Sequence, residues 1–477
     1  MLIALIDDGI DKTYCPGLTL KYDLVVEGSG TIRPRRSQEP VLTNHGTTCA
    51  QIIHKYAPSA EFCSLSIFSR TDLKANRSQF IFALMWCREQ RIPLIHMSVG
   101  SVSLSDYGAI RNAVSDLIQH GQILVAAQHN GNSRYTMPAC FSGVYGVSAD
   151  PALRDSSFRI NCNSRSDGVQ ILASARHDLS AYPNGTVETI VANSYAAPTI
   201  TAHLHQLLCQ PGIGSTSAQA LYKRLASDMC ASLARLRPDF LKEAIVYDFN
   251  QILPQTLVKY RMFHTQEIFS EAAHFLRAIE LDQYTPILLL PSKSENPHFF
   301  KEIFRQSVKR AGIVYAGTAP ADIKKISPCL FWDESVYASF MTSISESSAY
   351  QDIPKIMVEP CGEAAVRFLC KLERILAENA YNCVAVSDFS KSYLYNLLMV
   401  PNSCQVETLL SHICCTHQPD VILYSLRNEY LSGLHNLRIM LADICEPVFS
   451  QKGDEAIFPE NPSDNQICAL YRYLLKE

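Results

Sequence analysis

Four polar residues that lie far apart in the chain are of the types that acyl transfer on a peptide requires. This chemistry needs a nucleophile, a base to take its proton, an acid to orient the base, and donors for the oxyanion. Asp7, His45, Asn130 and Ser194 offer a carboxylate, an imidazole, an amide and a hydroxyl. Each stands where an apolar, strand-like segment ends or a helical pattern begins. In a parallel sheet such positions share one edge, where active sites form.

The local sequence predicts the element that positions each of these residues. LIALID ends at Asp7 and ILVAAQHN ends at Asn130, and both runs are typical of strands buried on both faces. The helical patterns HGTTCAQIIHKYAP and SYAAPTITAHLHQLL begin at His45 and Ser194. Between them, strand-like and helix-like segments alternate, for example AEFCSLSIF, SQFIFALMWCREQRI, PLIHMSVG and YGAIRNAVSDLIQHG. This alternation predicts a parallel sheet flanked by helices.

Each of the four residues, taken alone, also has a purely structural interpretation. A serine before a helix is commonly an N-cap, so Ser194 alone would be read as one. Asp7 fits a turn that ends a strand, and Asn130 belongs to a common Asn-Gly turn pair. His45 fits the start of a helix without any chemistry. The occurrence of all four, in order and at domain-like spacing, favours catalysis.

The flanking segments resemble the motifs of the subtilisin-like serine peptidases, the subtilases, over about residues 1–210. ALIDDGID resembles the aspartate motif, NHGTTCAQII the histidine motif and ANSYAAPTITA the serine motif, while VAAQHN resembles the strand that carries the oxyanion asparagine. The resemblance implies that Ser194 is the nucleophile and that His45 is the general base and later the acid. It implies that Asp7 fixes the tautomer of His45. Asn130 and the backbone N–H of Ser194 would then bind the oxyanion.

The same resemblance implies where a peptide substrate lies. Two segments match those that border the pocket for the side chain preceding the scissile bond, namely Ser98, Val99 and Gly100, and Ala126, Ala127 and Gln128. An extended substrate would pair with such edges by strand addition.

Several motif positions depart from the usual subtilase pattern. The serine motif normally reads Gly-Thr-Ser-Met, whereas here it reads Ala-Asn-Ser-Tyr, with Ala192 and Tyr195 at its ends. His129 stands where a glycine usually precedes the oxyanion asparagine, and we expect it to be structural or to contact substrate. Thr48 and Gln51 replace a common histidine and glycine. These changes delete no catalytic group, but together they predict an unusual cleft.

Composition narrows the class of protein. The 477 residues are 47% hydrophobic and 18% charged, which predicts two or more globular domains. The net charge of -4 and the lack of a basic stripe argue against nucleic acid as a partner. Seventeen scattered cysteines without a C-x-x-C pair argue against a zinc ribbon or a disulfide framework and fit a reducing compartment.

Targeting and ligand signals are also missing from the sequence. The N-terminus lacks a signal-peptide pattern, and no apolar run approaches the ~20 residues that span a bilayer. We therefore expect a cytoplasmic protein with no membrane partner. The aspartate strand begins at residue 2, so we expect no cleavable prodomain ahead of it. No acidic cluster indicates a calcium site, and we expect neither a metal nor a cofactor.

The remainder of the chain reads as a second part. We expect a peptidase domain at residues 1–212, a helical linker at 213–242 and a second α/β domain at 243–477, in which a loop-rich stretch with SISESSAY separates two sets of strands. PKIMVEPCGEAAVRFLCKLERILAENAYNCVAVSD has a degenerate phosphate-loop-like layout of strand, loop, helix and strand. Its loop EPCGEAAV lacks the G-x-x-x-x-G-K-[ST] pattern, so we do not expect nucleotide hydrolysis.

The second domain weakly resembles accessory proteins of bacterial systems that mature ribosomally made peptides, notably at AIVYDFN and the degenerate loop. This resemblance favours a cytoplasmic endopeptidase that cleaves a specific precursor peptide between leader and core. The second domain would recognise the precursor or a partner such as a peptide-modifying enzyme. Two alternatives stay open, namely a catalytically silent subtilase fold used for binding and a general intracellular protease. A plain interaction domain is also compatible with residues 243–477. The oligomeric state is left open.

Overall fold

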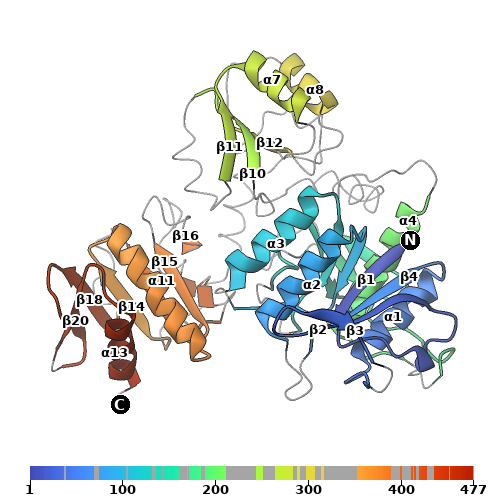
Figure 1. The fold of residues 1–477 in the computed structure, drawn as a ribbon, viewed down its shortest axis with the longest axis horizontal. Helices are drawn as coiled ribbons and strands as arrows, with labels where there is room; N and C mark the ends of the chain where they lie inside the picture. Colours follow the sequence, from blue (N-terminus) through green and yellow to red (C-terminus); the bar gives the residue numbers. More distant parts are fainter. Residues whose placement is uncertain are drawn as a thin grey trace. The chain divides into compact units, whose positions relative to one another are not determined.

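The strands in the described part of the chain form three sheets, which belong to two compact units (Figure 1). The first unit holds the first two sheets in chain order, and the second unit holds the third. The computed structural model describes residues 1–36, 39–68, 75–103, 106–130, 136–141, 143–160, 169, 171–183, 188–210, 243–250, 264–282, 287–290, 297–306, 313–315, 352–387, 398–399, 410–411, 413–414, 418–426, 435–450 and 452–475.

The first sheet has nine strands in the order β3-β2-β4-β1-β5-β6-β7-β9-β8. They are β1 Leu2–Asp7, β2 Thr19–Val26, β3 Ile32–Pro34, β4 Glu61–Ser66, β5 Leu94–Met97, β6 Ile123–Ala127, β7 Val144–Ala149, β8 Phe158–Ile160 and β9 Ile171–Ala173. The seven inner strands run parallel, and the edge strands β3 and β8 pair antiparallel with β2 and β9. The parallel sheet predicted for the first part of the chain is confirmed.

Helices cover both faces of this sheet (Figure 1). The helices α1 (His45–Tyr56) and α4 (Asn193–Leu208) pack against each other and share one core cluster with the sheet. The buried residues of α2 (Arg77–Glu89) and α3 (Tyr107–Gln119) lie outside that cluster, because these helices cover the opposite face. A short 3-10 helix, η1 (Lys12–Tyr14), follows β1.

Strand register explains why these segments bury their residues as they do. Ile3 on β1 pairs with Phe62 on β4 and Leu94 on β5, and Leu94 pairs with Ile123 on β6. This row of apolar side chains crosses four adjacent strands and belongs to the cluster under α1 and α4. Neighbouring residues of a strand face opposite ways, and helices cover both faces of this sheet. Successive residues inside β1 must therefore all be apolar. All residues from Ile3 to Ile6 are fully buried.

The strand order reverses at β1. The chain passes from β1 to β2, β3 and β4 on one side, and then crosses to β5, β6 and β7 on the other. In parallel sheets, ligands bind beyond the carboxyl ends of the strands at such a reversal. Asp7 is the last residue of β1, and it therefore lies at the position where the topology favours a site.

The second sheet is small and wholly parallel, with the order β11-β10-β12-β13. Its strands are β10 Glu243–Tyr247, β11 His264–Phe269, β12 Ile287–Leu289 and β13 Ile313–Tyr315, and its helices are α7 Ala272–Leu281 and α8 Pro297–Gln306. Tyr247, Phe275 and Phe299 form an aromatic cluster at the centre of its core.

The third sheet has seven strands in the order β16-β15-β17-β14-β18-β20-β19, and only β19 is antiparallel to its neighbour. Its elements are β14 Lys355–Glu359, β15 Cys383–Ser387, β16 Leu398–Met399, β17 Val421–Ser425, β18 Leu437–Ala442, β19 Val448–Phe449, β20 Glu455–Pro459, α11 Glu363–Glu378 and α13 Asp464–Leu475. Helix α11 buries Leu369, Leu372 and Leu376 at helical spacing against this sheet.

Parallel strands and helices therefore continue after residue 243, as the sequence predicted. The strands of residues 243–477 lie in two sheets with separate cores. The proposed helical linker at 213–242 and the loop with SISESSAY lie outside the described residues. Among the helices that the structure describes, none combines the length and the apolar character needed to cross a bilayer.

Candidate active site

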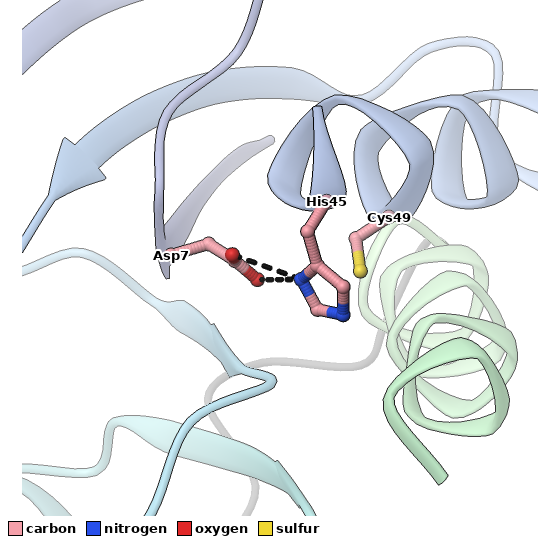
Figure 2. A group of neighbouring side chains, drawn as sticks. All are labelled: Asp7, His45 and Cys49. Atoms are coloured by element: carbon pink, nitrogen blue, oxygen red, sulfur yellow. Dashed lines mark hydrogen bonds and ion pairs between the residues drawn. The ribbon is translucent and has the colours of Figure 1, made fainter. Parts of the chain in front are cut away.

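Asp7 and His45 form the centre of the candidate site (Figure 2). Nδ1 of His45 lies 2.9 Å and 3.0 Å from the two carboxylate oxygens of Asp7. Asp7 is buried at the end of β1, and its Oδ1 also accepts the backbone N–H of Asp8 at 2.8 Å. A carboxylate at Nδ1 holds the proton on that nitrogen, which leaves Nε2 as the basic atom of a neutral imidazole.

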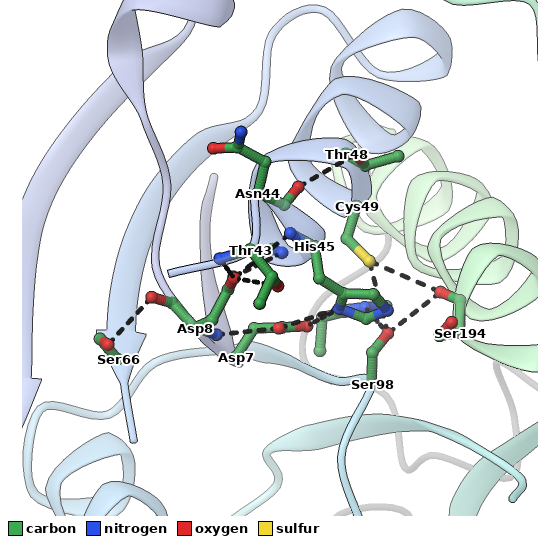
Figure 3. Close-up of polar contacts among 12 residues, drawn as sticks. Asp7, Asp8, Thr43, Asn44, His45, Thr48, Cys49, Ser66, Ser98 and Ser194 are labelled. Atoms are coloured by element: carbon green, nitrogen blue, oxygen red, sulfur yellow. Dashed lines mark hydrogen bonds and ion pairs between the residues drawn. The ribbon is translucent and has the colours of Figure 1, made fainter. Parts of the chain in front are cut away.

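Asp8, which directly follows β1, anchors the helix that carries His45 (Figure 3). Asn44 is the N-cap of α1 but makes no side-chain cap, and its φ of 62° places it in the left-handed region. The carboxylate of Asp8, directly after β1, instead accepts the N–H groups at the start of the helix. Its Oδ2 accepts from the backbone and hydroxyl of Thr43 at 2.8 Å and 2.6 Å and from the backbone N–H of His45 at 3.3 Å, and its Oδ1 accepts from Gly46 at 2.7 Å. A carboxylate there also matches the positive end of the helix dipole.

A glycine allows this close approach of α1 to the end of β1. A Cβ atom added at Gly46 would lie 2.6 Å from the backbone oxygen of Gly9 and 3.0 Å from Cβ of Asp7. Real Cβ atoms do not approach a backbone oxygen so closely, so any side chain would push the helix away. The Gly after His45 therefore sets the spacing at which Nδ1 reaches Asp7.

Ser194 is the second residue of α4 and does not cap it. The N-cap is Ala192, which has extended backbone angles. Pro198 has no N–H and cannot donate to the Ser194 carbonyl four residues earlier, as a helix requires. That carbonyl instead accepts from the hydroxyl of Ser98 at 3.1 Å and from the thiol of Cys49 at 3.5 Å. The contacts link the start of α4 to β5 and α1, and Figure 3 shows the imidazole of His45 between Asp7 and Ser194.

A buried histidine, His96, forms a hydrogen bond with Ser98. Nε2 of His96 lies 2.9 Å from the hydroxyl of Ser98, and its Nδ1 lies 2.8 Å from the hydroxyl of Thr201 on α4. Burial, and then the nearby His45, lower the pKa of His96 to about 3. His96 is thus a neutral link between β5 and α4 at any physiological pH.

The end of β6 meets α4 through a pair of asparagines. Oδ1 of Asn130 accepts the backbone N–H of Asn193 at 2.9 Å. The side chain of Asn193 in turn donates to the His129 carbonyl at 2.9 Å and accepts from the Ala149 N–H at 2.7 Å. Asn130 is exposed and is held, through its acceptor oxygen, beside the residue that precedes Ser194.

The proposed substrate-pocket segments lie beside these contacts. Ser98 and Val99 are partly buried and Gly100 is exposed, and a Cβ at Gly100 would lie 2.5 Å from the Met137 oxygen. The side chains of Ala126, Ala127 and Gln128 are buried, and Ala126 and Ala127 belong to β6, which pairs with β5 and β7. The hydroxyl of Ser148 donates to the side-chain oxygen of Gln128.

The charges around His45 determine its protonation. Burial lowers the pKa of His45, but the hydrogen bond and charge of Asp7 and the charge of Asp8 raise it by more. The net result is a pKa above the ordinary value of 6.5. Asp7 thus favours the imidazolium, the state that a base reaches when it takes a proton.

Cys49 completes a compact group with Asp7 and His45 (Figure 2). The ligand atoms of the three residues all lie within 4.8 Å of one another, close enough to hold a metal ion. Burial, followed by the charge of Asp7, raises the pKa of the Cys49 thiol well above 9. Metals bind the thiolate, and Nδ1 of His45 is already committed to Asp7, so the chemistry of this group fits a proton-transfer pair better than a metal site.

A family model settles the relationship of the chain. The model described as the subtilase family, Peptidase_S8, matches residues 1–239. The chain belongs to the subtilase family. No curated protein matches it. Similar solved structures include a lanthipeptide protease (14% identity, 48% of this chain and 75% of that chain, TM-score 0.35) and the prenylagaramide maturation protease PagA (19% identity, 48% and 83%, TM-score 0.36). Another is the protease domain of PatA (23% identity, 44% and 78%, TM-score 0.34).

Sequence reasoning missed several residues of this subtilase site. Asp8 is one of them, because its sequence position next to Asp7 fits a turn and gives no sign that it holds the helix that begins at His45. His96 and Thr201 were not singled out, because a polar residue in a buried strand or helix is visible only as an interruption of an apolar run. The sequence did show Pro198 inside a helical pattern, which was the available signal that the Ser194 carbonyl needs another donor.

Proposed function

We propose that the chain is a serine endopeptidase in which Asp7, His45 and Ser194 act together. The observation that carries the proposal is the two-oxygen contact of Asp7 with Nδ1 of His45 at the reversal point of the sheet. The contacts of the Ser194 carbonyl with Ser98 and Cys49 support it, because they bring the start of α4 to the same edge. Membership of the subtilase family agrees with peptide hydrolysis as the reaction.

In the proposed reaction, Oγ of Ser194 attacks the carbonyl carbon of the scissile peptide bond. Nε2 of His45 takes the hydroxyl proton and later donates it to the leaving amine. Asp7 stays ionised, keeps the tautomer of His45 and stabilises the imidazolium. Water then attacks the acyl-enzyme with His45 again acting as the base, which releases the second product and restores Ser194.

The oxyanion needs donors at the start of α4. The backbone N–H of Ser194 lies in the first turn of the helix, where it has no intrahelical acceptor. Asn130 is oriented by the hydrogen bond between its Oδ1 and Asn193, and in the proposal its Nδ2 supplies the second donor. Loss of one such donor typically costs about 2.7–4 kcal/mol of transition-state stabilisation.

For the substrate we propose a ribosomally made precursor peptide, cleaved between leader and core in the cytoplasm. The support is the sequence resemblance of residues 243–477 to accessory proteins of peptide maturation. In this proposal the part of the chain after residue 243 recognises the precursor or docks a peptide-modifying enzyme. The segments at residues 98–100 and 126–128 border the extended peptide.

The test is cleavage of candidate precursor peptides by the full chain and by its Ser194→Ala variant, read by mass spectrometry. The proposal expects one defined cut, made by the wild type alone. Equal products from both proteins would refute it. A fluorophosphonate probe separates the binding-protein alternative, because a silent subtilase fold leaves Ser194 unlabelled. Rapid digestion of casein without any partner would instead support a general protease.

A further inference from the structure

A tyrosine lies against the candidate base on the side of the helix that carries the candidate nucleophile. The rings of Tyr195 and His45 are stacked, with centroids 5.4 Å apart and an interplanar angle of 30°. Tyr195 directly follows Ser194 in α4, at the position where the sequence motif departs from the usual methionine. Its ring is partly buried and packs on the core cluster under α1 and α4. A methionine has no aromatic face to offer at this place.

The backbone of Tyr195 is held from two directions. Its N–H donates to the Ala192 carbonyl at 3.0 Å, and its own carbonyl accepts from Nε2 of His177 at 2.9 Å. His177 is buried, and its Nδ1 accepts from the hydroxyl of Tyr56, the last residue of α1, at 3.0 Å. The position of the ring is therefore set by contacts that join α4 to the helix of His45.

The physical consequence follows from the charge distribution of an aromatic ring. Its face is electronegative, and a cation within about 6 Å of the centroid is attracted to it. Neutral imidazole gains little from this face, whereas imidazolium gains the full attraction. An interaction that strengthens only when charge develops lowers the barrier of the step that develops it.

We propose that the ring of Tyr195 acts through His45 and stabilises its imidazolium form while Ser194 attacks. The proposal rests on the peptidase function proposed above. In the step concerned, the Oγ–C bond forms, the Oγ–H bond breaks, and the proton passes to Nε2 of His45. Tyr195 exchanges no proton in this step. Burial is the main cause that raises the pKa of its phenol to about 12, and the charges of Asp7 and Asp8 act in the same direction, so the ring stays neutral.

The other groups around the imidazole belong to three elements. Asp7 at the end of β1 and Asp8 directly after it favour the imidazolium, and Cys49 on α1 stays a neutral thiol because burial raises its pKa. His96 on β5 stays neutral because burial lowers its pKa to about 3. Among the described residues facing His45, Tyr195 on α4 thus adds a stabilising contact that is separate from the carboxylates.

The experiment is an NMR titration of His45 in the full chain carrying Ser194→Ala, with labelled histidine and with assignment by a His45→Gln variant. Tyr195→Leu removes the ring face and is expected to lower the pKa of His45 by roughly half to one unit. Tyr195→Phe keeps the face and is expected to keep most of the shift. Tyr22→Leu removes a tyrosine of β2 that is 44% exposed, and it serves as the matched control. An unchanged pKa in Tyr195→Leu would overturn the proposal.

The second readout is the kinetics of peptide cleavage by the protein in which Ser194 is intact. Tyr195→Leu is expected to lower kcat by about three- to tenfold with a smaller effect on KM, and to move the acid limb of kcat/KM to lower pH. A shifted pKa with unchanged kcat would overturn the catalytic role. The titration uses an inactive protein, so it reads the ring contact even if the peptidase assignment itself fails. Absence of cleavage by the wild type would instead refute the function.

Discussion

The carboxylate of Asp8 accepts the backbone N–H of His45 at 3.3 Å, so Asp7 at the end of β1 and Asp8 directly after it hold the ring and the backbone of one histidine. Asp8 also accepts the backbone N–H of Thr43, two residues before His45, and that of Gly46, the residue after it. The geometry explains how a helix whose N-cap makes no side-chain hydrogen bond still begins at a fixed place. It makes Asp8 a positioning residue for the base.

Replacing Asp8 tests this arrangement. Asp8→Ala removes an acceptor from three backbone N–H groups and a hydroxyl in a buried position, and we expect a loss of about 1–3 kcal/mol in the free energy of unfolding. Asp8→Asn keeps one acceptor oxygen and should lose less. Chemical denaturation measures both. Asp11→Asn, in which the changed residue is partly buried and caps η1, is the control. Equal stability of wild type and Asp8→Ala would contradict the role.

The spacing between α1 and β1 leads to a second prediction. Gly46→Ala places a Cβ 2.6 Å from the Gly9 oxygen, so α1 must shift and Nδ1 of His45 must move relative to Asp7. We expect kcat/KM to fall at least tenfold, and the overpacking to cost about 1–3 kcal/mol of stability. Gly362→Ala is the matched control, because nothing lies within 4 Å of a Cβ there and its φ of 171° is extended. Full activity of Gly46→Ala would show that the approach is not needed.

The pH dependence follows from the environment of His45. The active base is neutral, so kcat/KM should rise with pH and reach its plateau above the pKa of His45. Because Asp7 and Asp8 outweigh the effect of burial, that pKa lies above 6.5, and the acid limb of the profile should too. Asp7→Asn removes the main raising influence, so the limb should move to lower pH.

The rate on the pH plateau shows how much activity Asp7→Asn loses. An asparagine at this place leaves the imidazole in the wrong tautomer, which costs roughly 10⁴-fold in kcat in a well-studied serine protease. We expect a loss of that order in Asp7→Asn, measured with a cleavable peptide over a range of pH. An acid limb that stays in place while kcat collapses would show that Asp7 does not set the pKa of His45.

Much of this site follows from pattern and topology. A strand ending at Asp7, a strand ending at Ala127, and helices beginning near His45 and Ser194 place polar groups at one edge of a parallel sheet. The sequence predicted that the second strand continues to Asn130, whereas β6 ends three residues before it. The predicted βαβ order from residue 2 to residue 130 is confirmed by β1, β4, β5 and β6 and the helices between them. The alternation of strand and helix patterns predicts the direction in which each strand runs. That direction is enough to place residues that are distant in the sequence at the same edge of the sheet.

Other features depend on contacts that no single segment encodes. Asp8, directly after β1, accepts hydrogen bonds from the start of α1, and Ser98 donates to the carbonyl that Pro198 leaves without a helical donor. Both need the assembled sheet before their partners are defined. The inner strand β2 escaped prediction because its burial is irregular. Strand β19 escaped because it has only two residues, and β18 and β20 escaped because partly or fully exposed residues interrupt their buried ones. Such strands are defined by their neighbours more than by their own pattern.

Burial predicts the reactivity of the thiol beside His45. Cys49 is fully buried and its pKa is raised well above 9, so it should resist iodoacetamide in the native protein. Cys209 and Cys445 are exposed and should react under the same conditions. Peptide mapping by mass spectrometry reads all three sites, and labelling in denaturant shows that each peptide is detectable. Rapid native labelling of Cys49 would mean that the base and the thiol are more open than the contacts indicate.

His96 leads to the last prediction, because its effect on the site is geometric and not electrostatic. His96→Leu leaves the hydroxyls of Ser98 and Thr201 without their common partner in a buried place, and we expect a loss of about 1–3 kcal/mol of stability. The Ser194 carbonyl then loses an oriented donor, so kcat should fall several-fold. The pKa of His96 is about 3, so this histidine is neutral wherever the enzyme works, and its removal should leave the acid limb of kcat/KM unmoved. His120→Leu, at an exposed histidine, is the control for loss of an imidazole. A displaced acid limb in His96→Leu would show that His96 carries charge during the reaction and would assign it a different role.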